Sequence, residues 1–366
     1  MVVGSWDLRC IKILYLITDL DVGGAEKQLA LLAPRLDRRS FEVRVVCLKP
    51  EGPVAARIRA EGIPVESLGW RHLPDPRPLV RLEGILRGFR PRILHTFLVH
   101  ADLVGRLLGR FAKTPGILTS VRVTAETDRP WRAPLLRLTA GFVDGATFVS
   151  GPVADFARRR LRLGDVPSAV IPNSVEPAVS APSRRGPGPF RMLTAGRLTV
   201  QKGMDDVIVA MGLMDDDSSQ LVIAGEGPRL GYLELVALAS VVEDRVLFAG
   251  RCGSLDPWWR ESDVFILNSL FEGMPNVVLE AMAHGVPVVV SESASAGIVK
   301  DGETGWIVRN GVGDLDRVLR AVRDRPDEAF RRAERALAWV REHHRVETMV
   351  ERHEAFYRRI ASGRTQ

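Results

Sequence analysis

The stretch Val264–Gly285 reads VFILNSLFEGMPNVVLEAMAHG, and the apolar run Val286–Val290 follows it. Its first residues, Val264–Asn268, have the length and composition of a buried strand. Asn276–His284 has helical spacing, and Pro275 suits a first helical position because its missing N–H would be unpaired there. A strand, a helix and a second apolar strand predict a parallel sheet covered by helices.

The same alternation continues on both sides of this stretch within the second half of the chain. Each apolar run is short and is separated from the next by a segment with helical spacing. The charged tail Glu328–Ile360 is predicted to be helical throughout. The other strands are expected at Phe190–Ala195, Leu221–Ala224, Val246–Ala249 and Gly305–Val308, and the other helices at Met204–Met214, Tyr232–Val242 and Gly313–Arg323.

The first half of the chain shows the same pattern, so it predicts a second α/β sheet. The strands are expected at Cys10–Thr18, Phe41–Leu48, Pro64–Leu68, Ile93–Thr96, Ile117–Val121 and Gly145–Val149, and the helices at Ala25–Leu36, Val54–Glu61, Leu79–Gly88 and Ala101–Phe111.

Residues Pro172–Pro189 interrupt the alternation with a run rich in Pro, Ser, Gly and Arg, which is typical of a linker. A chain of 366 residues also fits two domains better than one. We therefore predict two Rossmann-like doubly wound domains, residues 1–175 and 176–344, with the ligand site in a cleft between them.

Charge and cysteine content narrow the class of protein. Residues 1–175 contain 27 Lys and Arg against 17 Asp and Glu, whereas residues 176–366 contain 24 against 28. The basic first half suggests phosphate groups or an anionic membrane surface as a partner. A solvated basic face without a partner is an equal alternative. No nucleic-acid-binding motif accompanies the basic residues. Three isolated cysteines and the lack of a long apolar segment favour a reducing, cytoplasmic location.

The turn after the strand at Val264–Asn268 is suited to bind a diphosphate. Gly273 lets the backbone bend towards a ligand, and the following helix points its first N–H groups at the turn, which makes an anion site. Glu272 lies in this turn and Glu280 about one helical turn beyond its start. Because carboxylates accept hydrogen bonds from sugar hydroxyls, the two could flank a bound nucleotide sugar.

Three further loops follow predicted strands, where ligands bind to open α/β sheets. Arg197 and Lys202 in AGRLTVQKG could neutralise a leaving diphosphate, although two surface basic residues would give the same pattern. The other two loops are AGEGP, with Gly225, Glu226 and Gly227, and VGGAE, with Gly23 and Gly24; each is weak alone and equally compatible with a plain turn.

Together these segments resemble the retaining glycosyltransferases of family 4, which have the GT-B fold. Glu272-x7-Glu280 matches the EX7E motif of that family, Arg197 and Lys202 its basic pair, and Ile171–Val175 (IPNSV) the start of its linker. The resemblance implies donor-sugar contacts for Glu272, ribose contacts for Glu280 and phosphate contacts for the basic pair. Further donor contacts are expected at Gly23, Gly24, Gly225, Glu226, Gly227, Gly273, Met274, Asn276 and Val277.

The resemblance also implies the remaining parts of the reaction. Transfer would proceed with retention, without a metal or other cofactor, from a nucleotide-diphosphate sugar to a glycan or lipid-linked acceptor. The helix of about residues 345–366 would return to the N-terminal domain, which would bind the acceptor. The enzyme would work in the cytoplasm, in peripheral contact with the inner face of the plasma membrane.

Two positions depart from the family pattern. Arg122 stands where many members have a histidine, so Arg122, His95 and His100 are the candidates for acceptor or sugar contacts, with a plain core or surface role open for the histidines. Ser295–Val299 lacks a glutamate that members often carry. A sugar-nucleotide epimerase and a non-catalytic sugar-nucleotide or lipid-binding protein on the same scaffold are the alternative functions.

Overall fold

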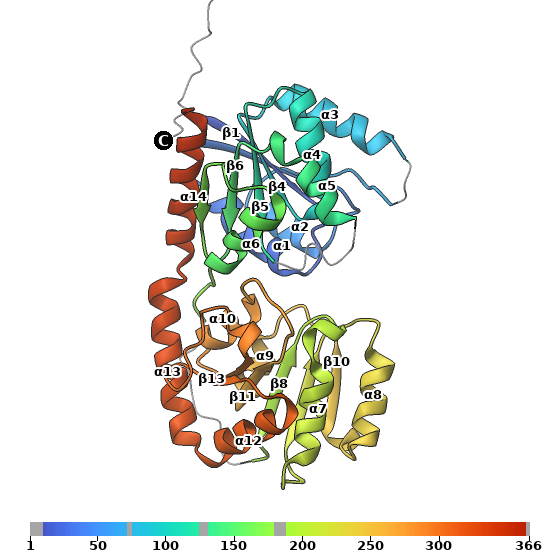
Figure 1. Ribbon diagram of the computed structural model, residues 1–366, viewed down its shortest axis with the longest axis vertical. Helices are drawn as coiled ribbons and strands as arrows, with labels where there is room; N and C mark the ends of the chain where they lie inside the picture. Colours follow the sequence, from blue (N-terminus) through green and yellow to red (C-terminus); the bar gives the residue numbers. More distant parts are fainter. Residues whose placement is uncertain (1–9, 72–74, 124–130, 179–187, 364–366) are drawn as a thin grey trace, which may run out of the picture. The chain divides into compact units, whose positions relative to one another are not determined.

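The computed structural model describes residues 10–71, 75–123, 131–178 and 188–363, and it divides into two compact units (Figure 1). Unit 1 comprises Met1–Asn173 and Val346–Gln366, and unit 2 comprises Ser174–Arg345. The boundary therefore lies two residues before the position expected from the sequence. The described part of the expected linker has no helix or strand; its residues 179–187 lie outside the described ranges.

Among its described residues, unit 1 contains a seven-stranded parallel sheet in the order β3-β2-β1-β4-β5-β6-β7. The central strands are apolar along most of their length, which is typical of a parallel sheet covered on both faces. The strands are β1 (Ile11–Ile17), β2 (Phe41–Cys47), β3 (Val65–Ser67), β4 (Ile93–Phe97), β5 (Gly116–Val121), β6 (Gly145–Phe148) and β7 (Ser168–Val170).

Two hydrophobic cores lie on the two faces of this sheet. One core holds residues of α1 (Gly24–Leu32), α2 (Pro53–Ala60) and α14 (Val346–Ala361), and the other holds residues of α3 (Arg77–Phe89) and α4 (Val99–Phe111). The helices α5 (Arg132–Leu138) and α6 (Gly151–Leu161) continue from α4 across the sheet (Figure 1). The last helix of the chain is thus part of the first unit.

A buried polar network fastens α14 to the unit 1 sheet. The Tyr357 hydroxyl is 3.0 Å from the Tyr15 hydroxyl and 2.8 Å from Nδ1 of His95, and all three side chains are inaccessible to solvent. Because a buried polar group without a partner is costly, this network specifies where α14 lies on the sheet.

Unit 2 contains a six-stranded parallel sheet among its described residues, in the order β10-β9-β8-β11-β12-β13. The strands are β8 (Arg191–Ala195), β9 (Gln220–Ala224), β10 (Val246–Gly250), β11 (Val264–Leu267), β12 (Val288–Ser291) and β13 (Trp306–Val308). The helices are α7 (Met204–Leu213), α8 (Leu230–Ala239), α9 (Asp256–Glu261), α10 (Asn276–Ala283), α11 (Glu292–Ser295), α12 (Gly311–Asp324) and α13 (Pro326–His343).

The prediction that the tail is helical throughout is wrong at two residues. The tail forms α13 and α14, and the chain leaves the helix at His344 and Arg345. At this break the carbonyl of His344 accepts a hydrogen bond from the Val175 amide (3.1 Å), where the chain first enters unit 2. The sequence keeps its helical pattern through this break, so the break cannot be seen in the sequence and is revealed only by the tertiary contacts.

Candidate functional site

The loops after β8 and β11 meet at the carboxyl edge of the unit 2 sheet. The amide of Leu270 donates to the carbonyl of Gln201 (2.8 Å), and the Gln201 side chain donates to the carbonyl of Phe271 (2.9 Å). These bonds bring Lys202 Nζ within 2.5 Å of Glu272 Oε1. Both side chains are mostly shielded from solvent, with 17% and 9% exposed. Two predicted site residues, 70 positions apart in the sequence, therefore form a charge-assisted hydrogen bond.

Gly203 holds the basic loop against the strand that carries the acidic one. Its φ is +54°, and a Cβ there would lie 2.3 Å from the carbonyl oxygen of Asn268. The Asn268 side chain donates in turn to Oδ2 of Asp206 (3.0 Å). Burial raises the pKa of Asp206, and the neighbouring Asp205 adds to this effect. Only glycine fits this contact, so the turn that positions Lys202 depends on it.

The loops after β8 and β9 also run in close contact. A Cβ on Gly225, whose φ is +149°, would lie 1.9 Å from the Gly196 carbonyl oxygen, and one on Gly227 would lie 2.4 Å from that of Leu198. The Leu198 amide donates to the Glu226 carbonyl (2.9 Å). The two glycines are thus required by backbone packing, and their contact with a nucleotide stays a prediction.

The helix α10 begins directly after the acidic loop. Pro275 precedes its first residue, Asn276, so the first N–H groups face the turn that holds Gly273 and Glu272. Glu280 lies in the second turn and is half-buried. Met274 and Val277 pack against the apolar core beneath this turn. Arg197 is exposed on the neighbouring loop. The predicted donor-site residues of unit 2 therefore lie along one edge of its sheet.

In unit 1, a carboxyl group that the sequence analysis did not single out, that of Glu26, lies beside the predicted glycine loop. Glu26, in the first turn of α1, is 6% exposed, and a Cβ on Gly23 would lie 2.2 Å from its Oε2. Burial raises the pKa of Glu26 to about 7, and Asp19 adds to this, whereas Arg122 opposes it. Glu26 belongs to the VGGAE stretch, so a signal for it was present in the sequence.

Arg122 lies at the end of β5, close to this carboxyl group. Its guanidinium donates to the side-chain oxygen of Asn173 and lies over the ring of Phe97, 5.9 Å from the ring centre. Asn173 belongs to the IPNSV stretch, so a signal for it was present in the sequence. Arg122, one of the two departures from the pattern that the sequence resembles, therefore places a cation at the carboxyl edge of the unit 1 sheet.

The structure separates the two candidate histidines. His95 is fully buried, contacts Tyr357 and Thr147, and has a pKa held well below its usual range by burial. This surrounding supports the core role that the sequence left open. His100 is exposed in the first turn of α4, with its ring centre 6.0 Å from that of Trp131.

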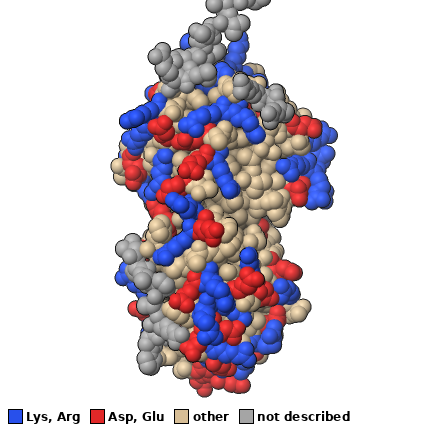
Figure 2. Space-filling model, turned by 90° about the vertical axis from the view of Figure 1, so that its left-hand side faces the viewer, with Lys and Arg blue, Asp and Glu red and all other residues tan. Residues whose placement is uncertain are grey.

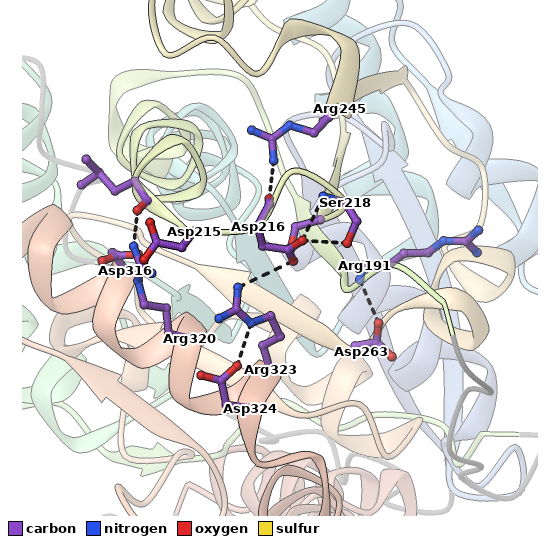
Figure 3. Close-up of polar contacts among 12 residues, drawn as sticks. Arg191, Asp215, Asp216, Ser218, Arg245, Asp263, Asp316, Arg320, Arg323 and Asp324 are labelled. Carbon is purple, nitrogen blue, oxygen red and sulfur yellow. Dashed lines mark hydrogen bonds and ion pairs between the residues drawn. The ribbon is translucent and has the colours of Figure 1, made fainter.

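A cluster of ion pairs occupies the opposite edge of unit 2 (Figure 3). Asp216 accepts from the amide and hydroxyl of Ser218 and lies 3.6 Å from Arg323. Burial raises the pKa of Asp216, but the hydrogen bonds from Ser219 and Ser218 and the charge of Arg323 outweigh it and lower the pKa to about 2. Because the cluster lies where β8, β9 and β11 begin, we assign it to stability.

The described ranges contain no group of three or more metal-ligating side chains. No helix in these ranges is both long and apolar enough to cross a bilayer. A cavity of about 410 Å³ lies between β13, α12 and α13 and contains none of the predicted site residues.

Two family models match the chain. Residues 22–179 match the model described as Glycosyltransferase Family 4, and residues 189–324 match the model described as Glycosyl transferases group 1. Together they cover most of both units, including every predicted donor-site residue.

Three curated relatives each span more than two thirds of the chain. An Escherichia coli UDP-Gal:alpha-D-GlcNAc-diphosphoundecaprenol alpha-1,3-galactosyltransferase is 25% identical over 78% of this chain and 80% of its own length. A Mycobacterium tuberculosis GDP-mannose-dependent alpha-(1-6)-phosphatidylinositol dimannoside mannosyltransferase is 27% identical over 70% and 71%. The lipopolysaccharide core mannosyltransferase LpcC of Rhizobium leguminosarum is 25% identical over 86% and 92%.

Solved structures share the fold. Anabaena HepE in complex with UDP superposes with a TM-score of 0.79 at 18% identity, covering 94% of this chain and 99% of that one. Sucrose-phosphate synthase from Thermosynechococcus elongatus gives 0.79 at 17% identity, covering 96% and 100%.

Proposed function

The chain belongs to family 4 of the glycosyltransferases and has the two-domain Rossmann-like GT-B fold, and on this premise we propose that it transfers a sugar from a nucleotide-diphosphate sugar to a lipid-linked or other surface-glycan acceptor, with retention at the anomeric carbon. The observation that carries the proposal is the Lys202–Glu272 pair beside the start of α10.

The chemistry follows from the charges at this edge. When the bond between the anomeric carbon and the diphosphate breaks, negative charge grows on the leaving phosphate. Lys202, Arg197 and the first N–H groups of α10 can stabilise that charge without reorganising at the moment of reaction. Glu272 accepts hydrogen bonds from the sugar hydroxyls, and Glu280 accepts them from the ribose.

The relatives support a uridine or guanosine donor. The Escherichia coli relative is named for UDP-galactose, the mycobacterial one for GDP-mannose, and HepE was solved with UDP. We propose that the loop Gly225–Gly227 lies near the base, because it follows β9, next to the loop that carries Arg197.

The acceptor side is proposed from unit 1. Two relatives are named for acceptors anchored in lipid through a diphosphate or a phosphatidylinositol. Such acceptors are anionic, which matches the excess of basic residues in the first half and the position of Arg122. His100 and Arg122 are the proposed contacts. The proposed place of action is the cytoplasmic side of a membrane, in peripheral contact with it.

We further propose that no metal is needed, because the cationic side chains at the site can take the place of a metal at the leaving group. Transfer should then be unchanged by EDTA. A loss of turnover on chelation that Mg²⁺ or Mn²⁺ restores would contradict this part of the proposal.

The first experiment is a thermal-shift screen of the full chain against nucleotides and nucleotide sugars. A ligand that binds only the native state raises the melting temperature, so a UDP or GDP ligand should give a clear rise. Glu280→Ala should abolish the rise, and Glu234→Ala, on the exposed face of α8, should preserve it. No rise with any nucleotide would contradict the proposed donor site.

A further inference from the structure

Five large apolar side chains are exposed along α4 and α5. On α4 these are Leu107 (41% exposed) and Phe111 (72%). At the start of α5 and along it they are Trp131 (40%), Leu135 (40%) and Leu138 (77%). We call these five residues the α4–α5 surface. Apolar groups gathered in this way on a water-soluble unit mark an interaction site rather than scattered exposure.

The exposed apolar residues of α4 and those of α5 form neighbouring rows, because the two helices are in contact and run in the same direction. The His100 and Trp131 rings meet near the two helix starts, and Arg106 donates to the carbonyl of Leu136 further along (3.1 Å). Leu107 and Phe111 are four residues apart, and Trp131, Leu135 and Leu138 follow at steps of four and three. Each set therefore lies on one side of its helix.

The described charges on and beside these two helices are mostly basic. The described acidic residue on α4 is Asp102, which is 1% exposed and bonded to Thr119, and α5 contains no acidic residue. Exposed cations flank the apolar stripe at Lys113 and Arg137. The adjoining α6 adds Arg158, Arg159 and Arg160, against one exposed acidic residue, Asp155, which pairs with Arg158 (3.5 Å).

Two other parts of the surface lack this combination. The α13 and α14 face shows basic and acidic side chains intermixed in both units (Figure 2). The outer side of α8 is also apolar, with Tyr232, Leu235 and Leu238 each 48% exposed or more, but its charges are mixed. Glu234, Glu243 and Asp244 are exposed, and Arg229 lies over the Tyr232 ring, 4.1 Å from the ring centre. An anionic surface would therefore attract the α4–α5 surface more strongly than that of α8.

We propose that the α4–α5 surface rests on an anionic lipid bilayer, with its apolar side chains at the level of the acyl boundary and its basic side chains among the head groups. The inference rests on the proposed function, because that function places the acceptor in a lipid. Both helices extend from the carboxyl edge of the unit 1 sheet, where Arg122 and His100 lie. Docking would therefore bring lipid head groups close to the proposed acceptor contacts.

The test is co-sedimentation of the full chain with vesicles of phosphatidylcholine alone or mixed with phosphatidylglycerol. We expect binding only to the phosphatidylglycerol vesicles, weakened by salt. Phe111→Glu combined with Leu138→Glu should reduce the bound fraction at least about tenfold, because it removes apolar contact and adds like charge. Leu235→Glu with Leu238→Glu on α8 is the matched control and should bind as the wild type does.

Three outcomes would overturn the proposal. The first is no binding of the wild-type chain to phosphatidylglycerol vesicles, and the second is an equal loss in the α8 control. The third is a wild-type dimer that Phe111→Glu with Leu138→Glu dissociates without any lipid binding, which would make the surface a protein interface. The melting temperature of each variant shows whether it is folded. The nucleotide-induced shift shows whether the proposed donor site still works, so a failure of the proposed function is distinguished from a failure of membrane docking.

Discussion

At the scale of single residues, the site depends on one charged contact. Lys202 and Glu272 were each predicted from their place after a strand, but their direct contact was not, because it depends on how Gln201 bridges the two loops. The sequence pattern can place residues at the edge of a sheet. The distance between two side chains at that edge depends on hydrogen bonds between loops, which leave no pattern in the sequence.

Removing either member of this pair should lower turnover. We expect Lys202→Ala and Glu272→Ala each to reduce kcat by about a hundredfold, because a preorganised group acting on developing charge contributes roughly 3 kcal/mol. The double variant should lose less than the sum, since the residues interact. Lys300→Ala, in an exposed ion pair with Glu303, is the control for steady-state kinetics. Unchanged kcat in both single variants would refute the assignment.

Gly225 gives a second test at this scale. Gly225→Ala should destabilise unit 2 by about 1–3 kcal/mol, because its φ and the contact with Gly196 admit no side chain. The melting temperature and the nucleotide-induced shift should both fall. Gly313→Ala, in α12 with open space around it, should raise the melting temperature slightly. Equal melting temperatures for the two variants would show that the loop relaxes at little cost.

At the scale of helices and strands, periodicity predicted the architecture well. The parallel strands of both sheets and the order of helices followed from apolar runs separated by helical spacing. The predicted elements did not include α5, α6, α11 or β7. The leucines of α5 largely face solvent, and β7 is a short edge strand with partly exposed residues. The periodicity of apolar residues reports burial, so elements such as α5 and β7, which bury little surface, leave a weak pattern.

The packing of α14 makes unit 1 sensitive to acid. Burial lowers the pKa of His353 from 6.5 to about 4, although the hydrogen bond to the Met349 carbonyl opposes the shift. The unfolded chain therefore binds more protons than the native one between these values, and stability falls as the pH is lowered through that window. For His353 alone the full loss corresponds to roughly 3 kcal/mol.

Chemical denaturation between pH 7 and pH 4 measures this effect. His353→Gln should flatten the dependence of the unfolding free energy on pH, because the variant side chain does not titrate. His343→Gln, which replaces an exposed histidine of α13, should leave it as in the wild type. If all three proteins lost stability equally on acidification, other groups, including the buried His95, would be responsible.

At the scale of the whole molecule, unit 1 is assembled from two distant parts of the chain. Met349, Phe356 and Tyr357 of α14 belong to the same core as Tyr15 and Phe41. We therefore expect a fragment of residues 1–173 to lack a cooperative thermal transition, and a peptide of residues 346–366 to restore one. A Tyr357→Ala peptide should restore it less. Calorimetry of the fragment with each peptide measures this; a cooperative transition without peptide would contradict it.

The same arrangement imposes an order on biosynthesis. A ribosome releases the strands of unit 1 first, yet the helix that covers Tyr15 and His95 is synthesised only after all of unit 2. Until then the part of the first sheet that α14 covers stays open to water and to other nascent chains. A stop codon in unit 2 would therefore damage the first domain as well, and chaperone demand should peak before the codons of α14 are read.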